Sequence, residues 1–159
     1  MKIGTGIMAA AASAAIAAAG IIGAPAASAD PQTAHFGAWQ KITDMNGGAA
    51  TIVAWGISDL RPSSDTLPDY PVVGKLWEAN AGFKAIQGTG TPIIPNLNAR
   101  TADGQNYQVI WQAATPQGIS GATLQQGDSS RGKLYFDVTG ANPTTVAYYN
   151  GAQDLLLWH

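Results

Sequence analysis

The chain has 159 residues, no cysteine and a formal net charge of −2 at pH 7. The lack of cysteine rules out disulfides, thiol nucleophiles and thiolate metal sites. The Lys and Arg residues are scattered and form no basic stripe, so we expect no nucleic-acid partner. The length suits one domain with a core of its own.

The first 29 residues have the three-part layout of a secretory signal peptide. A positive start at Met1-Lys2 precedes an uncharged run of Ala, Ile and Gly, and Ala27-Ser28-Ala29 supplies the small residues of a cleavage site. A transmembrane anchor is the alternative, but Ala and Gly partition weakly into lipid and no cationic stop-transfer cluster follows. We therefore expect cleavage between Ala29 and Asp30, export to the extracellular space without stable membrane insertion, and a mature domain over residues 30–159.

The first half of the mature region reads as strands. Period-2 alternation recurs, and no window carries the apolar stripe of an amphipathic helix. Strands are predicted at residues 36–44, 50–60 and 72–86, with a proline-rich surface loop at 61–71. Alternation assigns these side chains to inward faces: Val53, Trp55 and Ile57 in one strand, and Val73, Trp77, Ala79, Ala81 and Phe83 in the next. Glu78, the single glutamate, is expected to face solvent.

The second half continues the pattern. Strands at 97–100 and 106–113 flank Asp103-Gly104, a favoured turn pair, and the arm at 106–113 points Tyr107, Val109 and Trp111 the same way. A loop at 118–131 precedes a strand at 133–138, and Asn150-Gly151 joins strands at 144–149 and 153–158. Seven or eight short strands with regular turns predict a single all-β domain, an immunoglobulin-like antiparallel β-sandwich, with a small barrel as the alternative.

No pattern in the chain carries reaction chemistry. Residues 127–133 match a phosphate loop, but Leu134 stands where Ser or Thr must hold Mg²⁺, and a strand follows instead of a helix. Asp59, Asp65 and Asp69 surround the proline-rich loop without the spacing of a calcium loop, so a solvated acidic loop is the simpler interpretation. We expect no catalytic residue, no cofactor and no metal, and hence a protein that is not an enzyme.

Aromatic residues offer the candidates for ligand contact. Trp55, Trp77 and Trp111 are expected in the core, because a sandwich without disulfides gains most from burying large rings. Trp39 shares its predicted face with polar residues and is a candidate for exposure. Tyr148 and Tyr149 are adjacent in a strand, so one of them must point outward. Exposed rings of this kind stack on sugars, which makes Trp39, Tyr148 and Tyr149 the predicted contacts.

Several runs resemble a mycobacterial family of small secreted immunogenic proteins, also called immunoprotective extracellular proteins. The likeness starts from the run NARTADGQNYQVIWQA and covers most of residues 50–158, whereas residues 30–49 match poorly. The other matching runs are at 58–60, 70–72, 76–79, 119–123, 132–140 and 154–158. The resemblance implies an immunoglobulin-like sandwich, cleaved export and a free extracellular protein. It implies no biochemical activity.

The sequence thus predicts a secreted, non-enzymatic immunogenic protein that works as a binding module at the host–bacterium interface. Its contact surfaces are expected in the loops at 61–71 and 118–131, since the sheets supply the stability. A cell-envelope carbohydrate-binding module with exposed aromatics is the alternative. The partner is an unidentified protein or glycan, and the chain is expected as a monomer, with pairing of edge strands as the route to a dimer.

Overall fold

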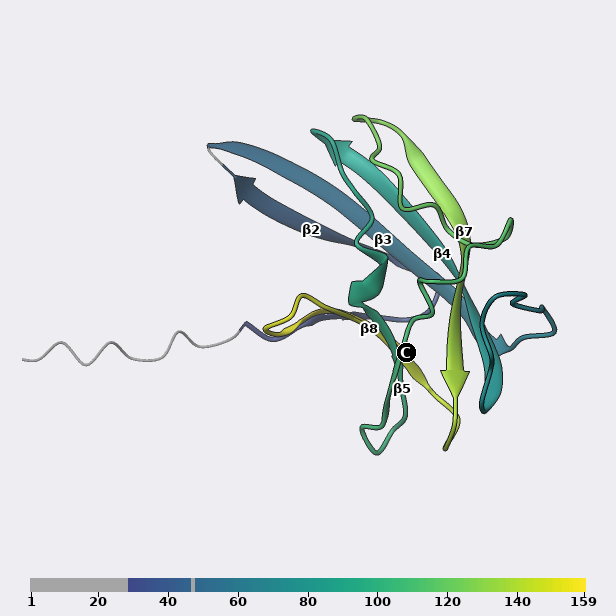
Figure 1. Cartoon of the computed structure of the whole chain (residues 1–159). Coiled ribbons are helices and arrows are strands. Elements are labelled where there is room, and N and C mark those ends of the chain that lie inside the picture. The colour runs from purple at the N-terminus through teal and green to yellow at the C-terminus, as the bar shows by residue number, and fades with distance from the viewer. Residues whose placement is uncertain (1–28, 47) are drawn as a thin grey trace, which may run out of the picture.

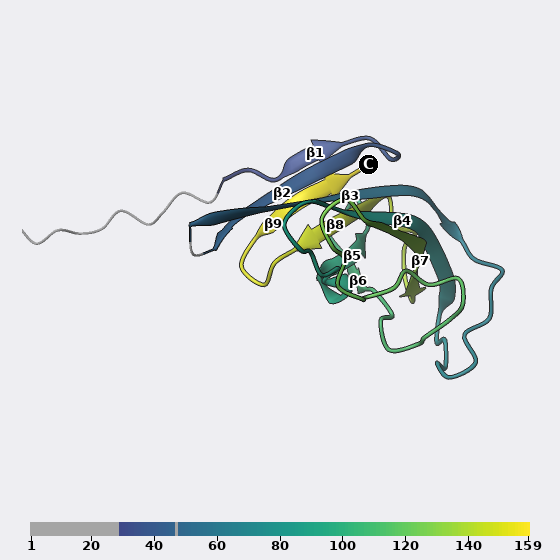
Figure 2. The same ribbon diagram turned by 90° about the horizontal axis from the view of Figure 1, so that it is seen from above.

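Two β-sheets packed face to face make up the computed structural model, which describes residues 29–46 and 48–159 (Figures 1 and 2). The five-stranded sheet has the order β1 (Gln32–Ala34), β9 (Asp154–Trp158), β8 (Thr145–Tyr149), β5 (Leu97–Arg100) and β6 (Asn106–Gln108). The four-stranded sheet has the order β2 (Trp39–Asn46), β3 (Ala49–Pro62), β4 (Lys75–Gln87) and β7 (Ser129–Val138). The predicted all-β sandwich is confirmed, and the sheets do not close into the alternative barrel.

Short turns connect most neighbouring strands, as the sequence predicts. The β8–β9 hairpin turns at Asn150-Gly151 and the β5–β6 hairpin turns at Asp103-Gly104, with Gly151 at φ +95° and Gly104 at φ +89°. Positive φ at these positions is the reason that glycine is needed there. A 3-10 turn, η1 (Ile94–Asn96), leads into β5. Of the described residues, none lies in a helix long and apolar enough to cross a membrane. Residues 1–28 of the predicted signal peptide lie outside the described part.

The core lies between the two sheets and is rich in large aromatic rings. Trp55 and Trp158 are fully buried, and the Trp55 ring contacts Phe83 edge-on at 4.9 Å between centroids and Tyr148 at 6.0 Å. The inward faces predicted for β3 and for most of β4 are confirmed. So is the inward face of β7, where Leu134, Phe136 and Val138 are all buried.

Four strand predictions need correction at their ends. One is β7, which begins at Ser129 and not at residue 133, so the predicted loop 118–131 ends before its last three residues. The first predicted strand begins at Trp39 and not at residue 36, because Gly37 takes a positive φ of 95°. Earlier in the chain, β1 forms a parallel pair with β9 that the sequence did not indicate. Val73 is 83% exposed and not inward, since β4 starts only at Lys75. The backbone N–H groups of Val73 and Gly74 donate to the Asp137 carboxylate, which turns the chain there. The predicted strand 106–113 ends at Gln108.

Candidate binding sites

The three aromatic residues predicted as ligand contacts do not converge in the structure. Trp39 is 39% exposed on the outer face of the four-stranded sheet, and Tyr149 is 37% exposed on the opposite sheet. Tyr148 is buried in the core, so Tyr149 is the member of the tyrosine pair that reaches the surface. No single groove therefore joins the three side chains.

The Trp39 ring lies flat on the outer face of the sheet. Trp39, Gly56 and Gly82 share one cross-strand row, and a Cβ atom added to Gly82 would lie 2.5 Å from the indole ring. The Lys84 Nζ atom sits 4.3 Å from the ring centroid, a cation–π contact. Trp39 thus covers two glycines and is partly covered by Lys84, which is the arrangement of a packing residue on a sheet surface.

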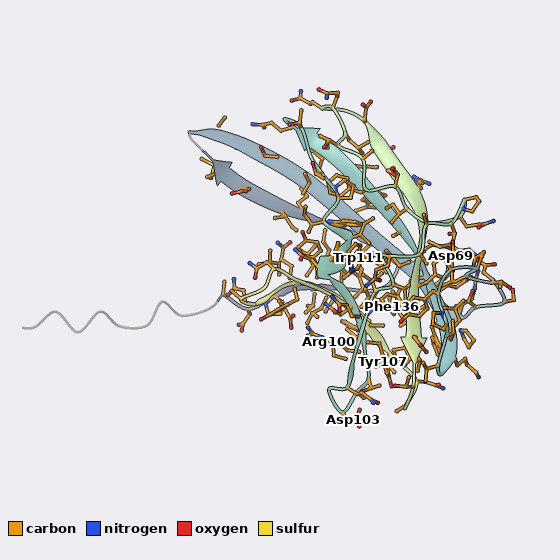
Figure 3. All side chains as sticks on the ribbon, viewed as in Figure 1. Asp69, Arg100, Asp103, Tyr107, Trp111 and Phe136 are labelled. Atoms are coloured by element: carbon orange, nitrogen blue, oxygen red, sulfur yellow. The ribbon has the colours of Figure 1, made fainter. Side chains whose placement is uncertain are left out.

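A cleft at the edge of the sandwich places an exposed aromatic ring beside an apolar hollow. We call it the Trp111 cleft. It has a volume of about 530 Å³, within the range of about 300–1,000 Å³ typical of ligand pockets. Trp111 is 53% exposed at this cleft, and Figure 3 shows it close to η1. The cleft is lined mainly by apolar groups, with these side chains among them: Pro92, Ile94, Pro95, Ile110, Ala113, Ile119 and Leu134.

Backbone hydrogen bonds to β7 fix the outer wall of this cleft. The N–H of Ile110 donates to the Tyr135 carbonyl at 2.8 Å, and the N–H of Ile119 donates to the Lys133 carbonyl at 3.1 Å. The chain between them is thus held at both ends. Gly132 allows the close approach, because a Cβ atom there would lie 2.4 Å from the Ile119 nitrogen.

The outward position of Trp111 corrects the prediction that it belongs to the core. Its N–H donates to the carbonyl of Val109, two residues earlier, so the chain turns tightly and the strand alternation ends. Tyr107 and Val109 keep the predicted inward direction. The sequence carried no direct signal for this turn, and alternation alone extended the strand too far.

The prediction that Glu78 faces solvent is also wrong, because its side chain is buried and the residue is only 3% exposed. One carboxylate oxygen accepts from Arg61 Nη2 at 2.9 Å, and the other accepts from Ser63 Oγ at 2.6 Å and Lys133 Nζ at 2.9 Å. Lys133 also donates to Asp65 at 2.7 Å. We call Arg61, Ser63, Asp65, Glu78 and Lys133 the Glu78 cluster. It ties the loop after β3 to the outer face of β4 and β7.

The cluster keeps its carboxylates ionised. Burial raises the pKa of Glu78, but hydrogen bonds from Ser63, Lys133 and Arg61 outweigh it and hold the pKa below its ordinary value. Hydrogen bonds from Lys133 and Tyr135 lower the pKa of Asp65. The pKa of Lys133 is raised by the same two carboxylates. Lys133 also lines the Trp111 cleft, and because its charge is paired within the cluster, the cleft presents a surface without a free charge.

The three aspartates near the loop do not come together at one site. Asp65 belongs to the Glu78 cluster, and Asp59 accepts from Asn80 Nδ2 at 2.7 Å. Asp69 lies farther along the loop (Figure 3). Among residues 29–46 and 48–159, no three His, Cys, Asp or Glu side chains gather into a group that could hold a metal ion.

Fold and site together define a single-domain β-sandwich that pairs its buried charges internally and opens an apolar cleft to solvent. The chain belongs to the family described as Domain of unknown function (DUF1942), whose model matches residues 31–158. It is 50% identical over 159 residues to the immunogenic protein MPT63 of Mycobacterium tuberculosis and, equally, to the immunogenic protein MPB63 of Mycobacterium bovis. Each alignment covers 99% of both proteins.

A solved structure agrees with this assignment. The crystal structure of MPT63, a secreted protein from Mycobacterium tuberculosis, superposes with a TM-score of 0.75 and 50% sequence identity, and covers 83% of this chain and 99% of the other. The resemblance seen in the sequence is confirmed. Its extent was underestimated, because the family match begins at residue 31 and includes the segment 31–49.

Proposed function

We propose that this chain is a secreted, non-enzymatic binding protein of the host–bacterium interface that contacts a protein partner through the Trp111 cleft. Support for secretion comes from the relatives, which are named immunogenic proteins, and from MPT63, described as a secreted protein. The signal peptide is removed between Ala29 and Asp30 in this proposal. N-terminal sequencing of the exported protein should find Asp30 first, and an intact Met1 would contradict it.

The single observation that carries the proposal is the half-exposed indole of Trp111 at an apolar cleft. Tryptophan is enriched among the residues that dominate protein interfaces, where it fills a pocket away from water. The cleft presents an uncharged surface to a partner, so a partner can cover the cleft without separating an ion pair. Part of its wall, at residues 118–121, comes from the predicted contact loop 118–131.

Replacing Trp111 with alanine should weaken partner binding about tenfold or more, because the aromatic anchor is lost. The measurement is saturable binding of fluorescently labelled protein to intact host phagocytes, with unlabelled protein as competitor. The melting temperature should stay near that of the wild type, since the ring is half-exposed.

Trp39→Ala is the matched control, because it removes a second half-exposed tryptophan from another face. It should leave cell binding unchanged. Equal binding by wild type and Trp111→Ala, or no saturable binding by the wild type, would contradict the proposed function.

A further inference from the structure

A row of hydrogen-bonded polar side chains crosses the outer face of the five-stranded sheet. At its centre Arg100 donates to both oxygens of Asp154, at 2.6 and 2.8 Å, and through Nε to Asn106 Oδ1 at 2.9 Å. Asn106 Nδ2 donates to Asn98 Oδ1 at 3.2 Å, and Asn98 Nδ2 donates to the Asn96 carbonyl at 3.1 Å. Each side chain is thus held in place by its neighbours before any ligand arrives.

The row keeps unused donors while its charges cancel. Arg100 has five N–H groups and donates through three of them, so two remain. The side-chain amides of Asn98 and Asn106 each donate through one of their two N–H groups. The bidentate pair with Asp154 neutralises the guanidinium. Such a surface suits a neutral ligand with many oxygen acceptors better than an anion.

Tyr149 supplies an aromatic ring beside this row. Its hydroxyl donates to the Gly151 carbonyl at 2.9 Å, which fixes the ring against the β8–β9 turn. Gly104, in the β5–β6 turn, also borders this region and leaves open space, because a Cβ atom there would meet nothing within 4 Å. Asn98, Arg100, Gly104, Asn106 and Tyr149 line one shallow hollow of about 420 Å³.

We propose that this hollow binds a neutral oligosaccharide. Sugar hydroxyls accept hydrogen bonds from amide and guanidinium groups, and the C–H face of a pyranose ring packs on an aromatic ring. A shallow hollow on a sheet face suits a sugar chain that enters and leaves at the surface. The site shares no residue with the Trp111 cleft, so the inference stands apart from the proposed protein contact.

The test is a titration of the full ¹⁵N-labelled protein, followed by two-dimensional NMR, with maltohexaose, mannohexaose and laminarihexaose as neutral probes. We expect at least one probe to give saturable shifts in the Asn98 and Asn106 side-chain amides and in the Gly104 and Tyr149 backbone amides. A hexamer of galacturonate should bind more weakly, because Arg100 is already paired with a carboxylate.

Tyr149→Ala should raise the dissociation constant for the sugar about tenfold or more. Tyr149→Phe keeps the ring and should raise the dissociation constant less. Trp111→Ala should leave sugar binding unchanged, which separates this site from the cleft. The proposal is overturned if no neutral probe shifts these signals, if the anionic hexamer binds more tightly, or if folded Tyr149→Ala binds like the wild type. A short peptide shifting the same signals in place of the sugars would likewise overturn it.

Discussion

Replacing Trp55 with alanine should lower the free energy of unfolding by about 3–5 kcal/mol. The indole is fully buried and contacts Phe83 in its own sheet and Tyr148 in the opposite one. Alanine would leave a cavity that the two sheets cannot close without moving toward each other. Urea unfolding followed by circular dichroism measures the loss.

Two variants sharpen this test. Trp55→Phe keeps an aromatic ring in the core and should cost clearly less than alanine. Trp39→Ala removes the same side chain from the sheet surface, where it is 39% exposed, and should also cost less. If Trp55→Ala and Trp39→Ala were equally destabilising, the packing of Trp55 between the sheets would not be the main source of its contribution.

Replacing Glu78 with glutamine should cost about 2 kcal/mol at pH 7. The charge-assisted hydrogen bonds to one oxygen become neutral ones, and the donors at the other oxygen face an amide NH2 group that cannot accept. Arg61, Ser63 and Lys133 all donate to this carboxylate. Glutamine is nearly the same size, so no cavity forms and the change reports on the charge and on the second acceptor oxygen. Urea unfolding at several pH values provides the measurement.

The direction of the pH effect follows from the lowered pKa of Glu78 and Asp65. A carboxyl whose pKa is lower in the folded state stabilises the fold above its unfolded pKa of about 4, and this contribution is lost as pH falls through the folded pKa. Wild-type stability should therefore begin to fall below about pH 4, because the unfolded chain takes up protons on these carboxyls before the folded protein does. The difference from Glu78→Gln should shrink as the pH falls further toward the folded pKa.

Asp69→Asn is the control for this second prediction. It removes an exposed carboxylate from the same loop and should change neither the stability at pH 7 nor its dependence on pH. A difference between wild type and Glu78→Gln that stays constant from pH 7 to pH 3 would show that Glu78 contributes through packing and not through its charge.

Trp111 and Glu78 show how much of the Trp111 cleft and of the Glu78 cluster could be predicted from the sequence. Strand alternation is a local property, and it placed Trp55, Phe83 and Phe136 in the core correctly. It failed at Trp111 because a tight turn, closed by the hydrogen bond from the Trp111 N–H to the Val109 carbonyl, ended the strand. It also assigned Glu78 to the outer face correctly, but it carried no information on which loop covers that face.

By itself the sequence determined the fold class, the two hairpins with glycine turns and most of the core, because alternation and turn chemistry act between neighbours in the chain. Only the tertiary structure decided which surfaces can bind. It placed Trp39 and Tyr149 on opposite sheets, joined the loop after β3 to Lys133, and held the wall of the Trp111 cleft against β7. These contacts join residues far apart in sequence, and their geometry depends on how the sheets pack, which no local pattern records.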